Sequence, residues 1–92
     1  RCWTFCMRKI KATRTFNKDF KQAGFSPALI EALYCLVKNQ PLPEKYRDHA
    51  LTGNLKGFRD CHIKPDLVLI YKISDDDTLE LYQLNSHAEV FG

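Results

Sequence analysis

The sequence predicts an α+β domain with two helices packed on one face of a mainly antiparallel four-stranded sheet. Helical patterns gather in the first half of the chain and strand patterns follow one another in the second half, as is typical of α+β folds. The chain has 92 residues, of which 45% are apolar, enough for one globular domain. The expected element order is β-α-α-β-β-β.

The first expected element is a strand over residues 7–13. Ile10 and Ala12 alternate with lysines, which predicts a strand with one apolar and one exposed face. The six residues before Met7 do not share this pattern. We therefore expect residues 1–6 to be extra N-terminal sequence and residues 7–92 to form the domain, with Met7 as its natural start.

Two helices are expected next. Thr15 is a candidate cap for a helix that begins near Phe16 and ends at Gly24. Ser26-Pro27 is a typical helix start, and the second helix must end before Pro41. Its apolar stripe has helical spacing and consists of Leu29, Ile30, Leu33, Leu36 and Val37.

A proline-containing loop over residues 41–50 precedes three strands, which are expected over residues 55–63, 67–73 and 78–84. The run of Asp75 to Asp77 suits the last hairpin turn. In the first of these strands, alternation places Phe58, Asp60 and His62 on one face. The aromatic residues of the strands are expected mainly in the core, namely Phe58, Tyr71 and Tyr82.

Composition narrows the classes of function. The net charge is +3, with basic residues concentrated in the N-terminal third and none after Lys72. Such a bias favours a nucleic acid or an acidic partner, although a solvated surface explains it equally well. No apolar run approaches the ~20 residues of a membrane span. The four cysteines form no C-x-x-C motif, which is consistent with reduced thiols in a cytoplasmic protein.

The candidate chemistry lies on histidines and carboxylates of the C-terminal half. Near neutral pH, histidine is the side chain best suited to giving and taking protons. A surface histidine is more often only a polar residue, and Asp60 with His62 could be a structural pair. No metal-binding spacing, phosphate-binding loop or dinucleotide fingerprint is present, so neither a metal nor a cofactor is expected. The candidates are His49, Asp60, His62, Asp66 and His87.

Two segments carry a family resemblance. Residues 46–72 read YRDHALTGNLKGFRDCHIKPDLVLIYK and residues 86–91 read SHAEVF. Both are similar to the corresponding motifs of the YafQ branch of the RelE-type bacterial toxins, and the resemblance extends over residues 7–92. It implies the RelE-like microbial ribonuclease fold.

The resemblance also implies an activity and partners. The family's members are ribosome-dependent endoribonucleases that cleave mRNA in the ribosomal A site without a metal or cofactor. They are inhibited by a cognate antitoxin and contact DNA only through the toxin–antitoxin complex. The family's catalytic positions match His49, Asp60, His62, Asp66 and His87, and its terminal aromatic residue matches Phe91. The implied reaction leaves a 2′,3′-cyclic phosphate and a 5′-hydroxyl.

One position departs from the family pattern. The arginine usually found four residues before the last histidine is replaced by Gln83, which cannot supply a charge to the scissile phosphate. The candidate substitutes are Arg59, Lys56 and Lys72. The alternative is a weakened toxin, or a non-catalytic module of the same fold that binds RNA, the ribosome or the antitoxin.

Overall fold

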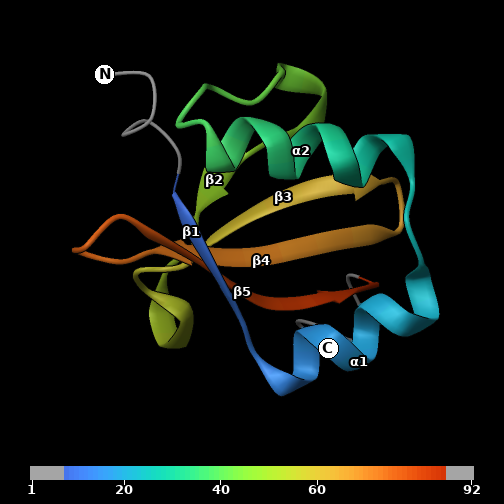
Figure 1. Cartoon of the computed structure of the whole chain (residues 1–92), viewed down its shortest axis with the longest axis horizontal. Coiled ribbons are helices and arrows are strands. Elements are labelled where there is room, and N and C mark those ends of the chain that lie inside the picture. Colours follow the sequence, from blue (N-terminus) through green and yellow to red (C-terminus); the bar gives the residue numbers. More distant parts are fainter. Residues whose placement is uncertain (1–7, 87–92) are drawn as a thin grey trace.

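A computed structural model describes residues 8–86, in which two helices cover one face of a five-stranded mixed sheet (Figure 1). The strand order is β1-β5-β4-β3-β2, with β1 parallel to β5 and the other pairs antiparallel. The α+β class is therefore confirmed. The elements are β1 (Lys9–Ala12), α1 (Arg14–Ala23), α2 (Pro27–Val37), the 3-10 turn η2 (Glu44–Tyr46), β2 (His49–Ala50), the 3-10 turn η3 (Gly53–Leu55), β3 (Arg59–Lys64), β4 (Leu67–Ile73) and β5 (Thr78–Asn85).

The sheet is mainly antiparallel as expected, but it differs from the expected four-stranded sheet in two respects. Part of the expected loop forms β2, which pairs His49 with Asp60 and is only two residues long. Such a strand is too short to leave a periodic pattern in the sequence. The second difference is the parallel pairing of β1 with β5, which aligns Lys9 with Thr78. Local sequence carries no signal for a contact between segments so far apart.

The first strand has no buried face. All four residues of β1 are exposed, and Ile10 is 54% exposed, so the expectation of an apolar inner face was wrong. β1 lies at the edge of the sheet, outside the area that the helices cover (Figure 1).

Arg8 fixes the chain just before β1. Its Nε lies 2.8 Å from Asp77 Oδ1, and its two terminal nitrogens donate to Leu36 O at 2.7 Å and Asn39 Oδ1 at 2.8 Å. One guanidinium thus joins the end of α2 to the β4–β5 hairpin. Arg8 is consequently a structural residue, although in the sequence it belongs to the basic N-terminal third.

Both helices have side-chain caps. Thr13, and not the expected Thr15, caps α1 by accepting the Phe16 N–H at 3.0 Å. At the other end Gly24 has a φ of 74°, a conformation that favours glycine. Ser26 caps α2 as expected, accepting the Leu29 N–H at 3.2 Å. None of the helices in residues 8–86 is long and apolar enough to cross a membrane.

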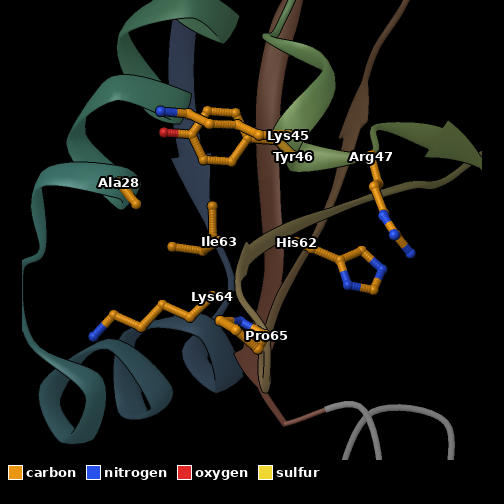
Figure 2. A pocket seen from close by; sticks show the side chains of 8 residues that line it. All are labelled: Ala28, Lys45, Tyr46, Arg47, His62, Ile63, Lys64 and Pro65. Atoms are coloured by element: carbon orange, nitrogen blue, oxygen red, sulfur yellow. The ribbon is translucent and has the colours of Figure 1, made fainter.

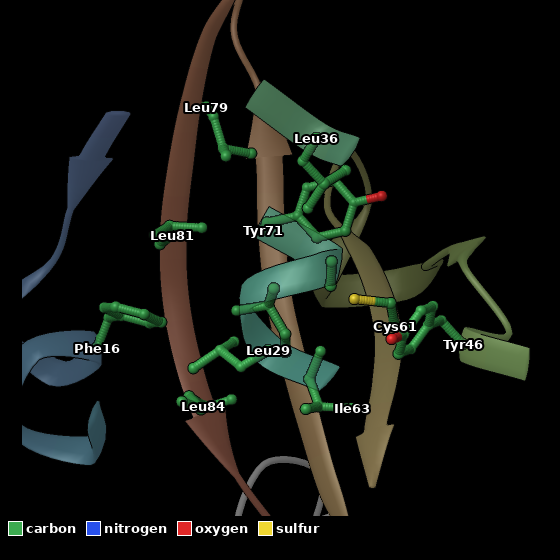
Figure 3. Packing of buried hydrophobic residues seen from close by; sticks show 12 residues of the cluster. Phe16, Leu29, Leu36, Tyr46, Cys61, Ile63, Tyr71, Leu79, Leu81 and Leu84 are labelled. Carbon is green, nitrogen blue, oxygen red and sulfur yellow. The ribbon is translucent and has the colours of Figure 1, made fainter. Parts of the chain in front are cut away.

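The core lies between the helices and the inner face of the sheet (Figure 3). Leu29 and Leu36 of the predicted helical stripe are buried, but Ile30 is 53% exposed and does not belong to it. Of the strand aromatics, Tyr71 is in the core whereas Phe58 and Tyr82 are not. The buried cluster consists of Phe16, Leu29, Ala32, Leu36, Tyr46, Cys61, Ile63, Leu69, Tyr71, Leu79, Leu81 and Leu84.

Candidate functional site

Three of the predicted site residues meet on the face of the sheet opposite the helices. His49 on β2 lies directly opposite Asp60 on β3, and His62 follows on the same face of β3. His49 Nε2 is 3.7 Å from Asp60 Oδ2, and His62 Nε2 is 3.5 Å from Asp60 Oδ1. The ring centroids of the two histidines are 6.4 Å apart. One carboxylate therefore lies between two imidazoles.

Asp60 is almost inaccessible to solvent. Its exposed fraction is 1%, and within residues 8–86 no donor reaches its Oδ1 with hydrogen-bond geometry. The His62 nitrogen lies within ion-pair distance of that oxygen but not in the geometry of a directed bond. A buried carboxylate that lacks a hydrogen bond is costly unless a nearby positive charge stabilises it. The two imidazoles, which lie within ion-pair distance of the carboxylate, are therefore positioned to stabilise it.

The backbone determines how His49 can share protons. Its Nδ1 lies 2.8 Å from the carbonyl oxygen of Arg47, which can only accept a hydrogen bond. Nδ1 must therefore carry a proton, and a proton on Nε2 toward Asp60 makes the ring a cation. The side chain of His49 is 53% exposed whereas that of Asp60 is 2% exposed, so the charge can still reach a ligand in solvent.

A groove with a volume of about 550 Å³ opens beside His62 (Figure 2). It runs along the part of β3 that the short β2 leaves unpaired. Figure 2 shows Arg47 next to the His62 ring, with Lys64 extending on the other side. Three cations line the groove, namely Lys45, Arg47 and Lys64.

The three cations were not among the residues predicted from the sequence. Arg47 comes directly before Asp48-His49 and Lys45 two residues earlier, so their proximity to a candidate histidine was a usable signal. Lys64 could have been found from its position two residues after His62. Phosphate groups are bound by such basic side chains.

Gln83 shares a row with the central pair. The register aligns His49, Asp60, Ile70 and Gln83 across four strands. Because neighbouring strands lie about 4.8 Å apart, Gln83 is roughly 10 Å from Asp60 on the same face. Ile70 between them is buried, so the sheet position between Asp60 and Gln83 in this row is apolar.

The other predicted substrate-binding residues are more scattered. Arg59 alternates with Asp60, and its guanidinium bonds to Asp48 at 3.0 and 3.2 Å. Those bonds raise the pKa of Arg59, and burial is the main cause of the raised pKa of Tyr71, whose hydroxyl donates to the same carboxylate. Lys56 is exposed after η3.

Asp66 is not part of the central group. It lies in the β3–β4 turn and lines a separate cavity of about 200 Å³ together with Asp19, Asn85 and Ser86. Two further candidates, His87 and Phe91, lie outside the described residues. Within residues 8–86, no group of three or more potential metal ligands is arranged to hold an ion.

Comparison with known proteins identifies the family. A model of the bacterial toxins of type II toxin–antitoxin systems named YafQ matches residues 8–92. The chain belongs to the YafQ toxin family. A Haemophilus influenzae protein that carries the name YafQ is 54% identical over 91 residues, covering 88% of this chain and 89% of that protein.

Two matches from Escherichia coli carry names that state an activity and a complex. The mRNA interferase toxin YafQ of strain K12 is 36% identical over 86 residues, which cover 92% of this chain and 86% of the relative. In the crystal structure of the E. coli DinJ–YafQ complex, the matching chain is 38% identical with a TM-score of 0.82, over 92% of this chain and 99% of that one. The shared fold thus extends over nearly the whole of the relatives.

Proposed function

We propose that this YafQ-family toxin is an endoribonuclease that cleaves mRNA on the ribosome. The observation that carries the proposal is the placement of Asp60 between His49 and His62 on the sheet face opposite the helices, beside a cationic groove. The name of the E. coli relative, an mRNA interferase toxin, supports the same activity. The DinJ–YafQ complex supports a cognate antitoxin as partner.

The reaction is an internal displacement at a phosphodiester. A base removes the proton of the ribose 2′-hydroxyl, the O2′–P bond forms and the P–O5′ bond breaks. An acid then gives a proton to the departing 5′ oxygen. The products are a 2′,3′-cyclic phosphate and a 5′-hydroxyl, and proton transfer by two side chains accounts for the whole step. We accordingly propose a reaction that needs no metal.

His62 is the best-placed base. Its Nε2 lies 3.5 Å from Asp60 Oδ1, so in the neutral ring protonated on Nε2 the lone pair resides on Nδ1, and Asp60 stabilises the imidazolium that forms after proton uptake. Asp60 is then a positioning residue and does not itself touch the substrate. His49, held between Arg47 O and Asp60, faces developing charge on the phosphate. We assign protonation of the leaving oxygen to His87.

The groove supplies the charge that Gln83 lacks. Arg47 and Lys64 flank His62 and can bind the phosphates next to the scissile bond. Arg59 is a poor substitute, because its Nε and one terminal nitrogen are engaged by Asp48 on the other face. Asp66, which lines a different cavity, receives no role in proton transfer.

The same proposal extends to the domain bounds, the partner, the place of action and the role of Phe91. Residues 7–92 form the toxin domain and residues 1–6 precede it. The antitoxin binds and silences this domain, and DNA is contacted only through that complex. The site of action is the cytoplasm, where mRNA is translated, and Phe91 contacts the substrate.

The test is a cleavage assay on translating ribosomes in buffer that contains Mg²⁺, which ribosomes require, with toxin used either directly after purification or after EDTA treatment and removal of the chelator. We expect both toxin preparations to cleave and to leave RNA ends that carry a 2′,3′-cyclic phosphate. His62→Gln should lower the single-turnover rate by about 10²- to 10⁴-fold. Loss of cleavage by the EDTA-treated toxin that an added transition metal restores would contradict the proton-transfer mechanism.

The cationic groove has its own matched control. Arg47→Gln with Lys64→Gln should weaken toxin binding to the ribosome–mRNA complex and reduce its salt dependence. Lys18→Gln with Lys21→Gln removes the same charge from the exposed surface of α1 and should have little effect. Equal losses in the two double variants would show that net charge, and not the groove, binds RNA.

Gln83 supports a second candidate function. Without the usual arginine, the domain could bind the ribosome or RNA and arrest translation without cutting. In that case growth arrest would persist in His62→Gln, and no RNA fragments would form with the wild-type protein.

A further inference from the structure

An aromatic pair lies on the outer face of the sheet, outside both the core and the proton-transfer group. The rings of Phe58 and Tyr82 meet edge to face, with centroids 4.4 Å apart and planes at 63°. Neither ring belongs to the buried cluster, and Tyr82 is 38% exposed. Large aromatic rings usually contribute to a core. This pair is instead open to a ligand.

The pair lies beside the cross-strand row that contains His49 and Asp60. Phe58 precedes Asp60 by two residues and so shares its face, about 7 Å away along the strand. The antiparallel pairing of β2 with β3 continues to Phe58, whose carbonyl accepts the Leu51 N–H at 2.9 Å. The rings therefore lie within one nucleotide of the Asp60 centre, on the same side of the sheet.

A cation accompanies the rings. Lys72 Nζ lies 5.5 Å from the centroid of the Phe58 ring. Glu80 is aligned with Lys72 on the neighbouring strand, but none of the ion pairs in residues 8–86 includes Lys72. The ammonium group is therefore available to a phosphate, and its contact with the ring keeps it close to whatever binds there.

Thr13 holds the backbone at Leu81 and Tyr82. The Thr13 hydroxyl donates to Tyr82 O at 2.7 Å, and the Thr13 N–H donates to Leu81 O at 3.0 Å. The β4–β5 register also shifts between Ile70 and Tyr71, opposite this point. Irregularities of this kind re-aim side chains beside functional sites. The backbone that carries the Tyr82 ring is thus held in place by hydrogen bonds.

From this geometry we propose that Tyr82, braced by Phe58, stacks on a nucleobase next to the scissile phosphate, while Lys72 binds the adjoining phosphate. The inference rests on the proposed action on RNA. Aromatic rings stack on any base, because every base has a π-face. The pair therefore holds the substrate in register without selecting its sequence, and its loss should mainly raise KM.

The experiment compares Tyr82→Leu, which removes the ring, with Tyr82→Phe, which keeps it. Tyr34→Leu is the matched control, because Tyr34 is an exposed tyrosine on α2. The probe is an mRNA with a 2′-O-methyl group at the scissile position and 2-aminopurine beside it, bound to ribosomes. Binding and fluorescence quenching are measured with this uncleavable RNA, and cleavage is measured with the natural RNA.

We expect Tyr82→Leu to raise KM and the dissociation constant about tenfold and to abolish the quenching. Tyr82→Phe and Tyr34→Leu should stay within about twofold of wild type. If Tyr82→Leu binds and quenches like wild type while folded, the stacking role is wrong. If wild-type protein quenches but never cleaves, the proposed nuclease activity fails while the stacking site stands.

Discussion

Within residues 8–86 two carboxylates are buried, one on each side of the sheet, and they differ in how they are hydrogen-bonded. Asp19 on α1 is 7% exposed and accepts hydrogen bonds from Leu84 N at 3.1 Å and Asn85 Nδ2 at 3.4 Å. Asp60 is 1% exposed, and its Oδ1 has no hydrogen-bond donor within residues 8–86. Asp19 anchors α1 to the end of β5, whereas Asp60 lies between two imidazoles.

The contrast shows how burial can serve two purposes. A buried charge whose oxygens are hydrogen-bonded fixes the structure around it. A buried charge that relies on ionisable neighbours is coupled to their protonation, which is the property that acid–base chemistry needs. The two positions therefore form a natural pair for the same Asp→Asn substitution, which removes the charge at nearly constant volume.

Asp60→Asn is expected to have the largest effect on activity. A neutral amide cannot stabilise the His62 imidazolium, so single-turnover cleavage on ribosomes should fall about 10²- to 10⁴-fold. The pH–rate profile should also change shape, a readout that a merely structural role would not alter. The free energy of unfolding, measured in urea, should stay the same or rise, because a poorly hydrogen-bonded buried charge is removed. Strong destabilisation would make Asp60 a second structural carboxylate.

Asp19→Asn should show the opposite profile. The amide can still accept the Leu84 N–H, but its NH₂ group then faces the donor of Asn85. We expect a loss of about 1–3 kcal/mol in the free energy of unfolding, measured in urea. The cleavage rate of the folded fraction at low temperature should change by no more than a few-fold. A rate loss as large as that of Asp60→Asn would remove the distinction between the two carboxylates.

Gln83→Arg tests whether the site lacks a positive charge near the reacting phosphate. The new guanidinium would lie on the same cross-strand row as Asp60, roughly 10 Å away, within reach of a bound phosphate. We expect cleavage to accelerate about tenfold with unfolding unchanged, since a charge aimed at the reacting phosphate favours the transition state. If the rate does not increase in the wild-type background but does in Arg47→Gln with Lys64→Gln, the groove already supplies that charge.

Sequence patterns located features that depend on nearby residues. The Gly24 and Ser26 helix ends, the shared face of Asp60 and His62, and the β4–β5 hairpin follow from local spacing. The two-residue β2 and the parallel β1–β5 pairing do not, because they depend on contacts between distant segments. The chain's net charge likewise could not separate Arg8, which is structural, from Arg47, which lines the groove.

The smallest expected effect is a change in the free energy of unfolding at alkaline pH, caused by Tyr46 on the helix side of the sheet. On the helix side, burial and a hydrogen bond to Glu31 raise the pKa of Tyr46 from 10.0 to about 12. A raised pKa in the folded state means that the folded protein binds the proton more tightly than the unfolded chain does. Its contribution to stability is present below pH 10 and is lost between about pH 10 and 12.

Urea unfolding across this range should therefore show declining stability above pH 10, and the decline should be shallower in Tyr46→Phe. Cleavage, which depends on the imidazoles of the open side, should vary with pH nearer neutrality, where Tyr46 stays protonated. An activity profile that follows the alkaline loss of stability would mean that the proton-transfer groups are not the histidines. If the cleavage rate and the free energy of unfolding change in separate pH ranges, proton transfer belongs to the sheet face that carries the histidines, and the alkaline loss of stability belongs to the helix side.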